Sequence, residues 1–393
     1  MSNNMGYELT RELLQLGFGV FAACAWIAAR RLSYSTAVLV AAMRTVIPVI
    51  YFAWYFDGSW TFIDDFMYFH QGQFLLDNGY TPLSALTPEG IETLKGLAGG
   101  DHILYIWWNF FMMWLFGVNY YAPVCINVVI TFVSAHFFSE LLAEVGFHER
   151  YRRVLHVFYL LHWETIAWSS FINLKDATVQ LLTILLFLSA IRCVRRRSWR
   201  AGAACLVVAQ LFAWIRFYIP AVAACAGMAW IFLEWRDWRK YVFLGGASLA
   251  GLSLVPKLLD RVHSVNPAIA LWGAGHYLLT PQPWAILPSY SFLEIPSVCH
   301  WLMFLPAIFG AVYLWNESRA ARLLLIYVAA LVAFYSLVVD LQGVRHRSQI
   351  SFIFAWLQMH FLWRWVSAPA SQEVSAGPAV VAQSQPTPLL GMS

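Results

Sequence analysis

The chain has 393 residues and a formal net charge of +4; 60% of its residues are hydrophobic and only 12% are charged. Ordinary soluble domains have about 45–50% apolar and about 25% charged residues, so lipid must surround most of this chain. The small net charge, with basic residues beside apolar segments, follows the positive-inside pattern and excludes a nucleic-acid partner. The composition therefore predicts an all-α polytopic membrane protein in contact with membrane lipids.

Apolar runs of nearly twenty residues, the length that crosses a hydrocarbon layer of about 30 Å, recur from residue 12 to residue 364. Basic clusters between these runs are expected on the cytoplasmic side. They are Arg30-Arg31, "HERYRR" (148–153), "RRRSWR" (195–200), "EWRDWRK" (234–240) and "NESRAAR" (316–322). About eleven transmembrane helices follow, at residues 12–29, 36–56, 120–138, 153–171, 176–194, 202–219, 220–234, 241–258, 300–315, 322–339 and 349–365.

One further apolar run, "ILYIWWNFFMMWLFG" at 103–117, would put "HERYRR" on the wrong side if it crossed the bilayer. We expect it to lie along the outer surface, with Trp107, Trp108 and Trp114 in the headgroup zone. A short tilted span is the alternative.

A single transmembrane domain over residues 1–366 is therefore expected. Its first outer loop, with interfacial helices, covers 57–119, and a second long outer loop covers 259–299. The remainder, 367–393, is rich in Pro, Ser, Ala and Gln and should form a disordered cytoplasmic tail.

Two adjacent acids, Asp64 and Asp65, follow the second expected span by about eight residues and so lie near the outer surface. Adjacent residues on a helix point about 100° apart, so one acid could face a site while the other caps the helix. His70 lies at a helical spacing from both and would share a pocket wall. The alternative is a capping pair that only opens an interfacial helix.

Two other outer segments carry charges that need partners. Lys175 and Asp176 open a span after "WSSFINL", where the alternative is a lysine that reaches the surface beside its own counter-ion. Arg216 precedes Tyr218 in "FAWIRFYIP" and has no acid near it in sequence. It should pair with an anion from elsewhere, either Asp64 or Asp65, or a phosphate.

A basic turn, "GVRHRSQ", supplies Arg345, His346 and Arg347 on the outer side, against the positive-inside tendency. Planar guanidinium groups suit bidentate contact with phosphate, and anionic lipid headgroups in general are the alternative ligand. No HxxxH, HExxH or CxxC spacing supports a metal site, so no metal or cofactor is expected.

The order of these segments resembles the GT-C superfamily of integral-membrane glycosyltransferases, especially bacterial proteins similar to protein O-mannosyltransferases and aminoarabinose transferases. The resemblance rests on "IDDFMYFHQGQFLLDNGY" in the first outer loop, on "MMWLFGVNYY" at the end of the flat helix, on the "SSFINLKD" turn and on the late "GVRHR" turn. It covers roughly residues 36–200 well and the rest loosely.

The resemblance implies a GT-C-like fold and a glycosyltransferase at the outer face of the bacterial inner membrane. A polyprenyl-phosphate-linked sugar would be the donor, and a lipid-linked glycan or surface polysaccharide the acceptor. Asp64 or Asp65 would take the role of the family's first-loop aspartate, the general base, while arginines neutralise the departing phosphate.

Three other functions stay open. A polysaccharide polymerase or ligase would use undecaprenyl-diphosphate-linked glycans, and the basic outer turn suits a diphosphate equally. A flippase or transporter of lipid-linked sugars would need charges through the bilayer centre, where this chain has few. A structural subunit of a polysaccharide export complex is the last alternative.

Overall fold

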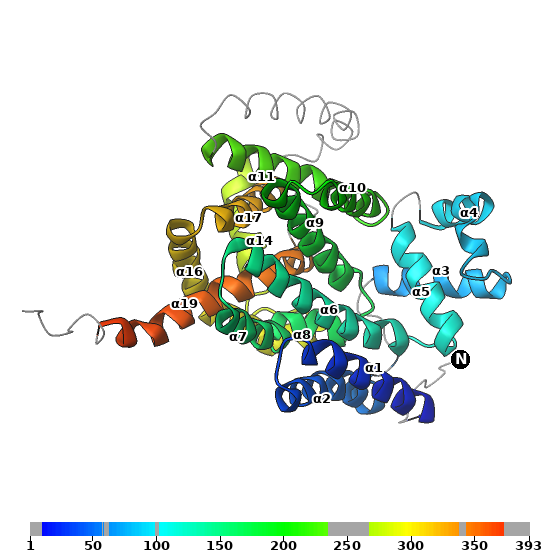
Figure 1. Ribbon diagram of the computed structural model, residues 1–393. Helices are drawn as coiled ribbons and strands as arrows, with labels where there is room; N and C mark the ends of the chain where they lie inside the picture. The colour runs from blue at the N-terminus through cyan, green and yellow to red at the C-terminus, as the bar shows by residue number, and fades with distance from the viewer. Residues whose placement is uncertain are drawn as a thin grey trace, which may run out of the picture.

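The structure is a computed structural model that describes residues 10–56, 58, 63–98, 102–234, 267–337 and 343–372. Within these residues every regular element is a helix, and no strand occurs among them (Figure 1). The predicted all-α class is therefore confirmed.

Five helices in the described ranges are long and apolar enough to cross a membrane. They are α1 (Arg11–Ala29), α2 (Tyr34–Ile50) extended by the π-helical turn η1 (Tyr51–Tyr55), α6 (Tyr121–Val145), α9 (Asp176–Arg196) and α17 (Arg319–Leu337). A sixth is formed if the pair Tyr290–Leu302 and Phe304–Glu317, bent by 52°, counts as one broken span. This content of apolar helices supports a membrane protein.

The other segments expected to span differ in length or continuity. Residues 202–219 and 220–234 form the shorter apolar helices α10 (Trp199–Ala213) and α11 (Tyr218–Glu234), and 349–365 lies within α19 (Ser351–Gln372). The segment expected at 153–171 is two helices, α7 (Glu149–Leu160) and α8 (Trp163–Ser170), because Leu161 and His162 leave helical geometry between them. The segment expected at 241–258 lies outside the described residues.

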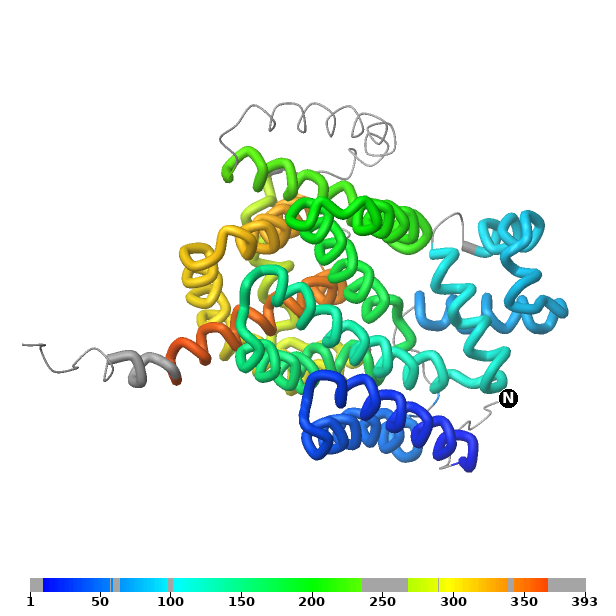
Figure 2. The backbone as a smooth tube through the Cα atoms, in the orientation of Figure 1, coloured from blue at the N-terminus to red at the C-terminus, as the bar shows by residue number. Residues whose placement is uncertain are grey.

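Helices α6 and α9 form the centre of the bundle. Of the most apolar window of each, 61% of the residues are buried, against 33% in α1 and 39% in α17. Figure 2 shows the α1–α2 hairpin along one side of this centre, and large apolar side chains on its outer surface, such as Phe18 and Trp26, are exposed. A helix that is apolar on all sides and half exposed is one that faces lipid.

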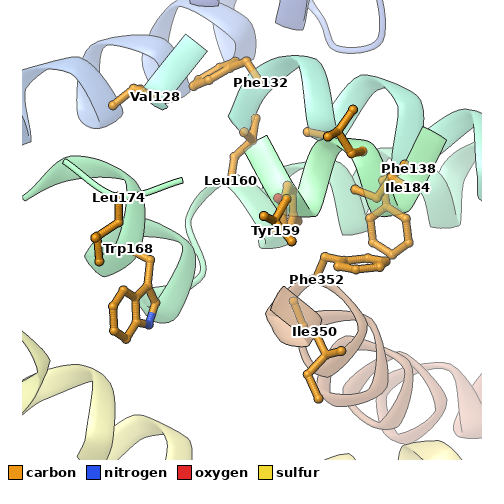
Figure 3. Packing of buried hydrophobic residues seen from close by; sticks show 14 of the residues in the cluster. Val128, Phe132, Phe138, Tyr159, Leu160, Trp168, Leu174, Ile184, Ile350 and Phe352 are labelled. Atoms are coloured by element: carbon orange, nitrogen blue, oxygen red, sulfur yellow. The ribbon is translucent and has the colours of Figure 1, made fainter. Parts of the chain in front are cut away.

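Side chains from α6, α7, α9 and α19 interdigitate in the core (Figure 3). Phe138 of α6 meets Phe352 of α19 edge-to-face, with ring centroids 5.3 Å apart. Several polar groups in this region pair with one another, as burial favours. Gln180 of α9 accepts a hydrogen bond from the Tyr159 hydroxyl and donates one to the carbonyl oxygen of Ser348.

Three helices of the segment expected as the first outer loop gather at one end of the bundle, beside the start of α6 (Figure 1). They are α3 (Ile63–Asp77), α4 (Pro88–Ala98, after the 3-10 turn Ser84–Leu86) and α5 (Ile103–Phe116). Helices α3 and α5 approach closely because Gly72 lacks a side chain; a Cβ there would lie 3.0 Å from the amide nitrogen of Phe110. The 14 residues of α5 extend about 21 Å, less than a hydrocarbon layer.

The later segments expected on the outer side are also helical where they are described. Residues 267–299, expected as a loop, contain the turn η4 (Pro267–Ile269), α14 (Ala270–Leu279), the turn η5 (Pro288–Leu293) and the start of α15 (Glu294–Leu302). The basic turn forms α18 (Val344–Arg347), followed by the turn η7 (Ser348–Ile350). Of the expected tail, residues 367–372 continue α19, and the rest lies outside the described residues.

Gly310 of α16 (Phe304–Glu317) allows this helix to touch the backbone of α19, and a Cβ there would collide with the carbonyl oxygen of Leu357. We expect Gly310→Ala to lower the free energy of unfolding by about 1–3 kcal/mol, since overpacking forces the two helices apart. Thermal unfolding of the detergent-solubilised protein would measure this.

Gly227→Ala is the matched control, because Gly227 lies in α11 and, among the described residues outside its own helix turn, no atom lies within 4 Å of the added Cβ. It should leave the unfolding temperature unchanged or slightly raise it. Equal unfolding temperatures for the two variants would contradict the close approach of α16 and α19.

Candidate functional site

Charged residues from four separate segments meet at the end of the bundle that carries α3 and α5. We call this group of described residues the charged cluster. Its members are Asp64, Lys175, Asp176, Arg216 and Arg345. Asp64 and Arg345 are 281 residues apart in sequence. The fold therefore brings together residues that the sequence presented in four unrelated places.

Arg345 lies between two carboxylates. Its Nη1 donates to Oδ2 of Asp64 at 2.6 Å, and its Nε lies 3.6 Å from Oδ2 of Asp176. The Asp64 side chain is 35% exposed, whereas that of Asp176 is fully buried. The cluster is thus accessible from the side of Asp64 and closed behind Asp176.

Arg216 forms the deep end of the cluster. Its Nη2 donates to Oδ1 of Asp176 at 2.9 Å, and its Nη1 donates to the Tyr218 hydroxyl at 3.3 Å. The Tyr218 hydroxyl in turn lies 2.8 Å from the hydroxyl of Tyr335, which also accepts from Nε2 of Gln349 at 2.7 Å. In the described contacts, Asp176 is therefore the carboxylate that pairs with Arg216, where the sequence predicted Asp64 or Asp65, or a phosphate.

Lys175 is almost completely buried, and its Nζ contacts the ring of His102, with Nε2 at 3.2 Å. Burial, together with the positive charges of Arg216 and Arg345, holds the pKa of Lys175 well below its usual value despite the nearby Asp176 and Asp64. The ammonium group is thus the least stable charge of the cluster when no further anion is present.

The surroundings of Asp64, unlike those of Lys175, favour its charged form. Burial acts to raise the pKa of the Asp64 carboxyl, but Arg345, Lys175 and His102 outweigh it, and the pKa lies below its ordinary value. The Tyr68 hydroxyl also donates to Oδ2 of Asp64 at 3.3 Å. At neutral pH Asp64 is therefore an ionised, partly accessible carboxylate beside cations.

The structure separates the two acids of the pair. Asp65 is buried on the other side of α3, where the Tyr120 hydroxyl donates to its Oδ2 at 3.0 Å. The same hydroxyl accepts from the backbone N–H of Asn173 at 3.1 Å. Asp65 thus ties the start of α3 to the start of α6 and to the turn before α9.

His346 joins the cluster through its neighbours, with its ring centroid 5.1 Å from that of Tyr335. Burial and the charges of Arg216, Arg345 and Lys175 hold the pKa of His346 well below its ordinary value, so this ring is neutral. A neutral imidazole beside three cations can accept a proton when their charge is balanced by an added anion.

Two other predicted residues lie elsewhere. Arg347 is buried in the core, where Nη2 donates to Oε1 of Glu164 at 2.7 Å and Nη1 donates to the carbonyl oxygen of Leu278 at 2.9 Å. His70 lies on the exposed face of α3, with its ring centroid 4.2 Å from that of Phe66. Of the basic turn, Arg345 and His346 therefore reach the cluster and Arg347 does not.

Sequence reasoning missed His102 and the asparagines that hold the turn before α9. His102 adopts a left-handed conformation, φ 63°, which is uncommon outside glycine, and its Nδ1 lies 3.3 Å from the carbonyl oxygen of Ile215. Asn127 of α6 donates to the carbonyl oxygen of Leu174 at 3.2 Å, and Asn173 accepts from the Tyr105 hydroxyl at 3.0 Å. A polar residue within an apolar span, such as Asn127, was the available signal.

The arrangement can bind an anion and accept a proton. Arg345, the most accessible of its cations, lies next to Asp64, a carboxylate that can act as a base, while Lys175 and Arg216 lie deeper. Within the described residues, no group of three or more His, Cys, Asp or Glu side chains could hold a metal ion. Comparisons with protein-family models, with curated proteins and with solved structures gave no match.

Tyr120→Phe should lower the free energy of unfolding by about 1–3 kcal/mol, because it removes a donor from the buried carboxylate of Asp65. Thermal unfolding in detergent measures the change. Tyr34→Phe is the control, since Tyr34 is 79% exposed and its hydroxyl can bond to water. If both variants unfold at the same temperature, the Tyr120 hydroxyl does not stabilise Asp65.

Proposed function

We propose that this protein is a GT-C-like glycosyltransferase of the bacterial inner membrane that moves a sugar from a polyprenyl-phosphate donor to a lipid-linked glycan or surface polysaccharide. The observation that carries the proposal is the meeting of Asp64 with Arg345, Arg216 and Lys175 at one end of an apolar helix bundle. A transferase of this kind needs a base and several cations at one point near the membrane surface.

The cations would bind the phosphate of the donor. Arg345 is the most accessible of the three, with a side chain 14% exposed, and would contact the phosphate oxygens directly. Lys175 and Arg216 lie deeper and would neutralise the charge that grows as the sugar leaves. Asp176 would keep both arginines in place, through its hydrogen bond with Arg216 and its longer ion-pair contact with Arg345.

Asp64 would be the general base. The acceptor hydroxyl oxygen forms the new bond to the anomeric carbon of the sugar, and Asp64 takes the hydroxyl proton. The bond from that carbon to the phosphate oxygen breaks, and its electron pair stays on the polyprenyl phosphate. The partial exposure of Asp64, in contrast to the buried Asp65, supports this assignment.

The placement in the membrane is part of the proposal. About eleven spans would carry the chain through the bilayer, and α3, α4 and α5 would lie at the outer, periplasmic surface. Exposed apolar side chains of this group support such a position, because interfacial helices expose them to the acyl boundary. They include Phe66, Phe74, Leu83, Trp114 and Leu115.

A polymerase or ligase that uses a diphosphate-linked glycan is the second candidate. Three cations grouped in the described charged cluster favour it, since a diphosphate carries more negative charge than a monophosphate. A transporter is less well supported, because the cluster lies at helix ends: Asp64 in the first turn of α3 and Asp176 at the start of α9.

Mass spectrometry of lipid-linked glycans would test the function in cells that lack the protein and carry wild type or a variant. Asp64→Asn should lower transfer by about 10²–10⁴-fold, the usual contribution of a general base, so that glycans lack one sugar. Asp77→Asn is the control: Asp77 is an exposed acid at the far end of the same helix.

Two other outcomes of this experiment would argue against the proposed transferase or against its base. Accumulation of complete single repeat units would favour the polymerase or ligase. A glycan pool that is unchanged by Asp64→Asn, at equal amounts of protein in the membrane, would contradict the role of Asp64 as base.

A further inference from the structure

Arg345 has one carboxylate partner on the buried side and another on the accessible side. Asp176, on the buried side, is held by Arg216 as well, with 2.9 Å between Nη2 and Oδ1. Asp64, on the accessible side, makes the shorter contact with Arg345, 2.6 Å, yet keeps about a third of its side chain exposed. The pair of Arg345 with Asp64 is therefore the part of the cluster that a ligand can reach.

Asp64 occupies the position that an external anion would take. A guanidinium group presents its donors in one plane, and carboxylate and phosphate oxygens compete for the same N–H groups. Here Asp64 Oδ2 accepts from Nη1 of Arg345, the group on the accessible side. A phosphate that approaches from that side meets a cation already neutralised by a carboxylate of the protein itself.

We infer that Asp64 is an internal competitor for the phosphate site: a phosphate-bearing ligand displaces the Asp64 carboxylate from Arg345, and binding of the donor thereby releases the base. The inference rests on the proposed function for the class of ligand, a polyprenyl phosphate. It goes beyond that function because it couples occupancy of the donor site to the availability of Asp64.

The exchange leaves the rest of the cluster in place. Asp176 keeps its contact with Arg345, at 3.6 Å from Nε, and Arg216 keeps its bond to Asp176. Asp64 then loses a positive partner and gains a negative neighbour, and both changes raise the pKa of its carboxyl and make it a stronger base. Donor would bind before acceptor, because Asp64 becomes free to take a proton only after the exchange.

The test is the affinity of the purified full chain for farnesyl phosphate, a short polyprenyl phosphate, with uncharged farnesol as the matched probe. Asp64→Asn should bind farnesyl phosphate about threefold or more tightly than wild type, the range of a partly exposed ion pair. Asp77→Asn should bind it like wild type. Farnesol should bind equally to all three proteins.

A double-mutant cycle identifies the group for which Asp64 competes. Arg345→Ala should weaken binding of farnesyl phosphate, and Asp64→Asn should no longer tighten it when Arg345 is absent. Arg195→Ala is the control for loss of an arginine; Arg195 is exposed in the last turn of α9.

The inference is supported if Asp64→Asn binds farnesyl phosphate more tightly than wild type and if this gain requires Arg345. A damaged fold would weaken binding and so does not produce this result. Unchanged or weaker binding by a variant with wild-type unfolding temperature overturns it, and so does equal tightening in the Arg345→Ala background. If Asn at this position lowers the unfolding temperature, Asp64→Ser decides by the same criteria.

The test also distinguishes this inference from the proposed function. Tighter binding without any sugar transfer in cells would leave a prenyl-phosphate site in a protein that is no transferase. Transfer without tighter binding would leave a transferase whose base is free at all times.

Discussion

The alternating chain of charges Arg216–Asp176–Arg345–Asp64 is the constraint on which the rest of this structure depends. Taking one charge out of water costs several kcal/mol, and removing one member of a buried pair leaves the other uncompensated. Alternation of sign gives each inner member of the chain two opposite neighbours. Because the four residues come from four segments, the same contacts fix α3, the start of α9, the turn before α11 and α18 against each other.

Lys175 adds a positive group beside this alternating chain of charges. Within the charged cluster, as far as the chain is described, it adds a third cation to two carboxylates and is itself buried. An unbalanced positive charge in a buried site that excludes water is unfavourable unless a ligand brings negative charge. The low pKa of Lys175 expresses this cost, and an anion at the accessible side of Arg345 would remove it. The buried amine of Lys175 is thus a group that gains from added negative charge where the proposed donor would bring its phosphate.

The sequence was sufficient to predict the helical class, and it located the charged residues at the ends of apolar runs, since both follow from the low polarity of lipid. It could not tell which of two neighbouring charged residues reaches the cluster. Asp64 and Asp65 are neighbours, yet one faces Arg345 and the other Tyr120; Arg345 and Arg347 are two residues apart, yet one reaches the cluster and the other the core. Which residue reaches the cluster depends on the rotation of each helix about its own axis relative to its neighbours. A local sequence pattern does not determine that rotation. His102 escaped notice for the same reason: only the left-handed backbone and the fold bring it to Lys175.

Arg347 explains why a displacement at Arg345 can stay local. Helix α18 has only four residues, too short to keep its place by its own hydrogen bonds. Arg347 holds it from the opposite side, through Glu164 of α8 and through the carbonyl oxygens of Leu278 and Thr280 at the C-terminal end of α14. His300 lies 3.1 Å from the same carboxylate oxygen of Glu164, and its Nε2 lies 2.8 Å from the carbonyl oxygen of Leu278. With the backbone of α18 held in the core, an arriving phosphate need move only the accessible carboxylate of Asp64, and Arg345 can change partners without any change of fold.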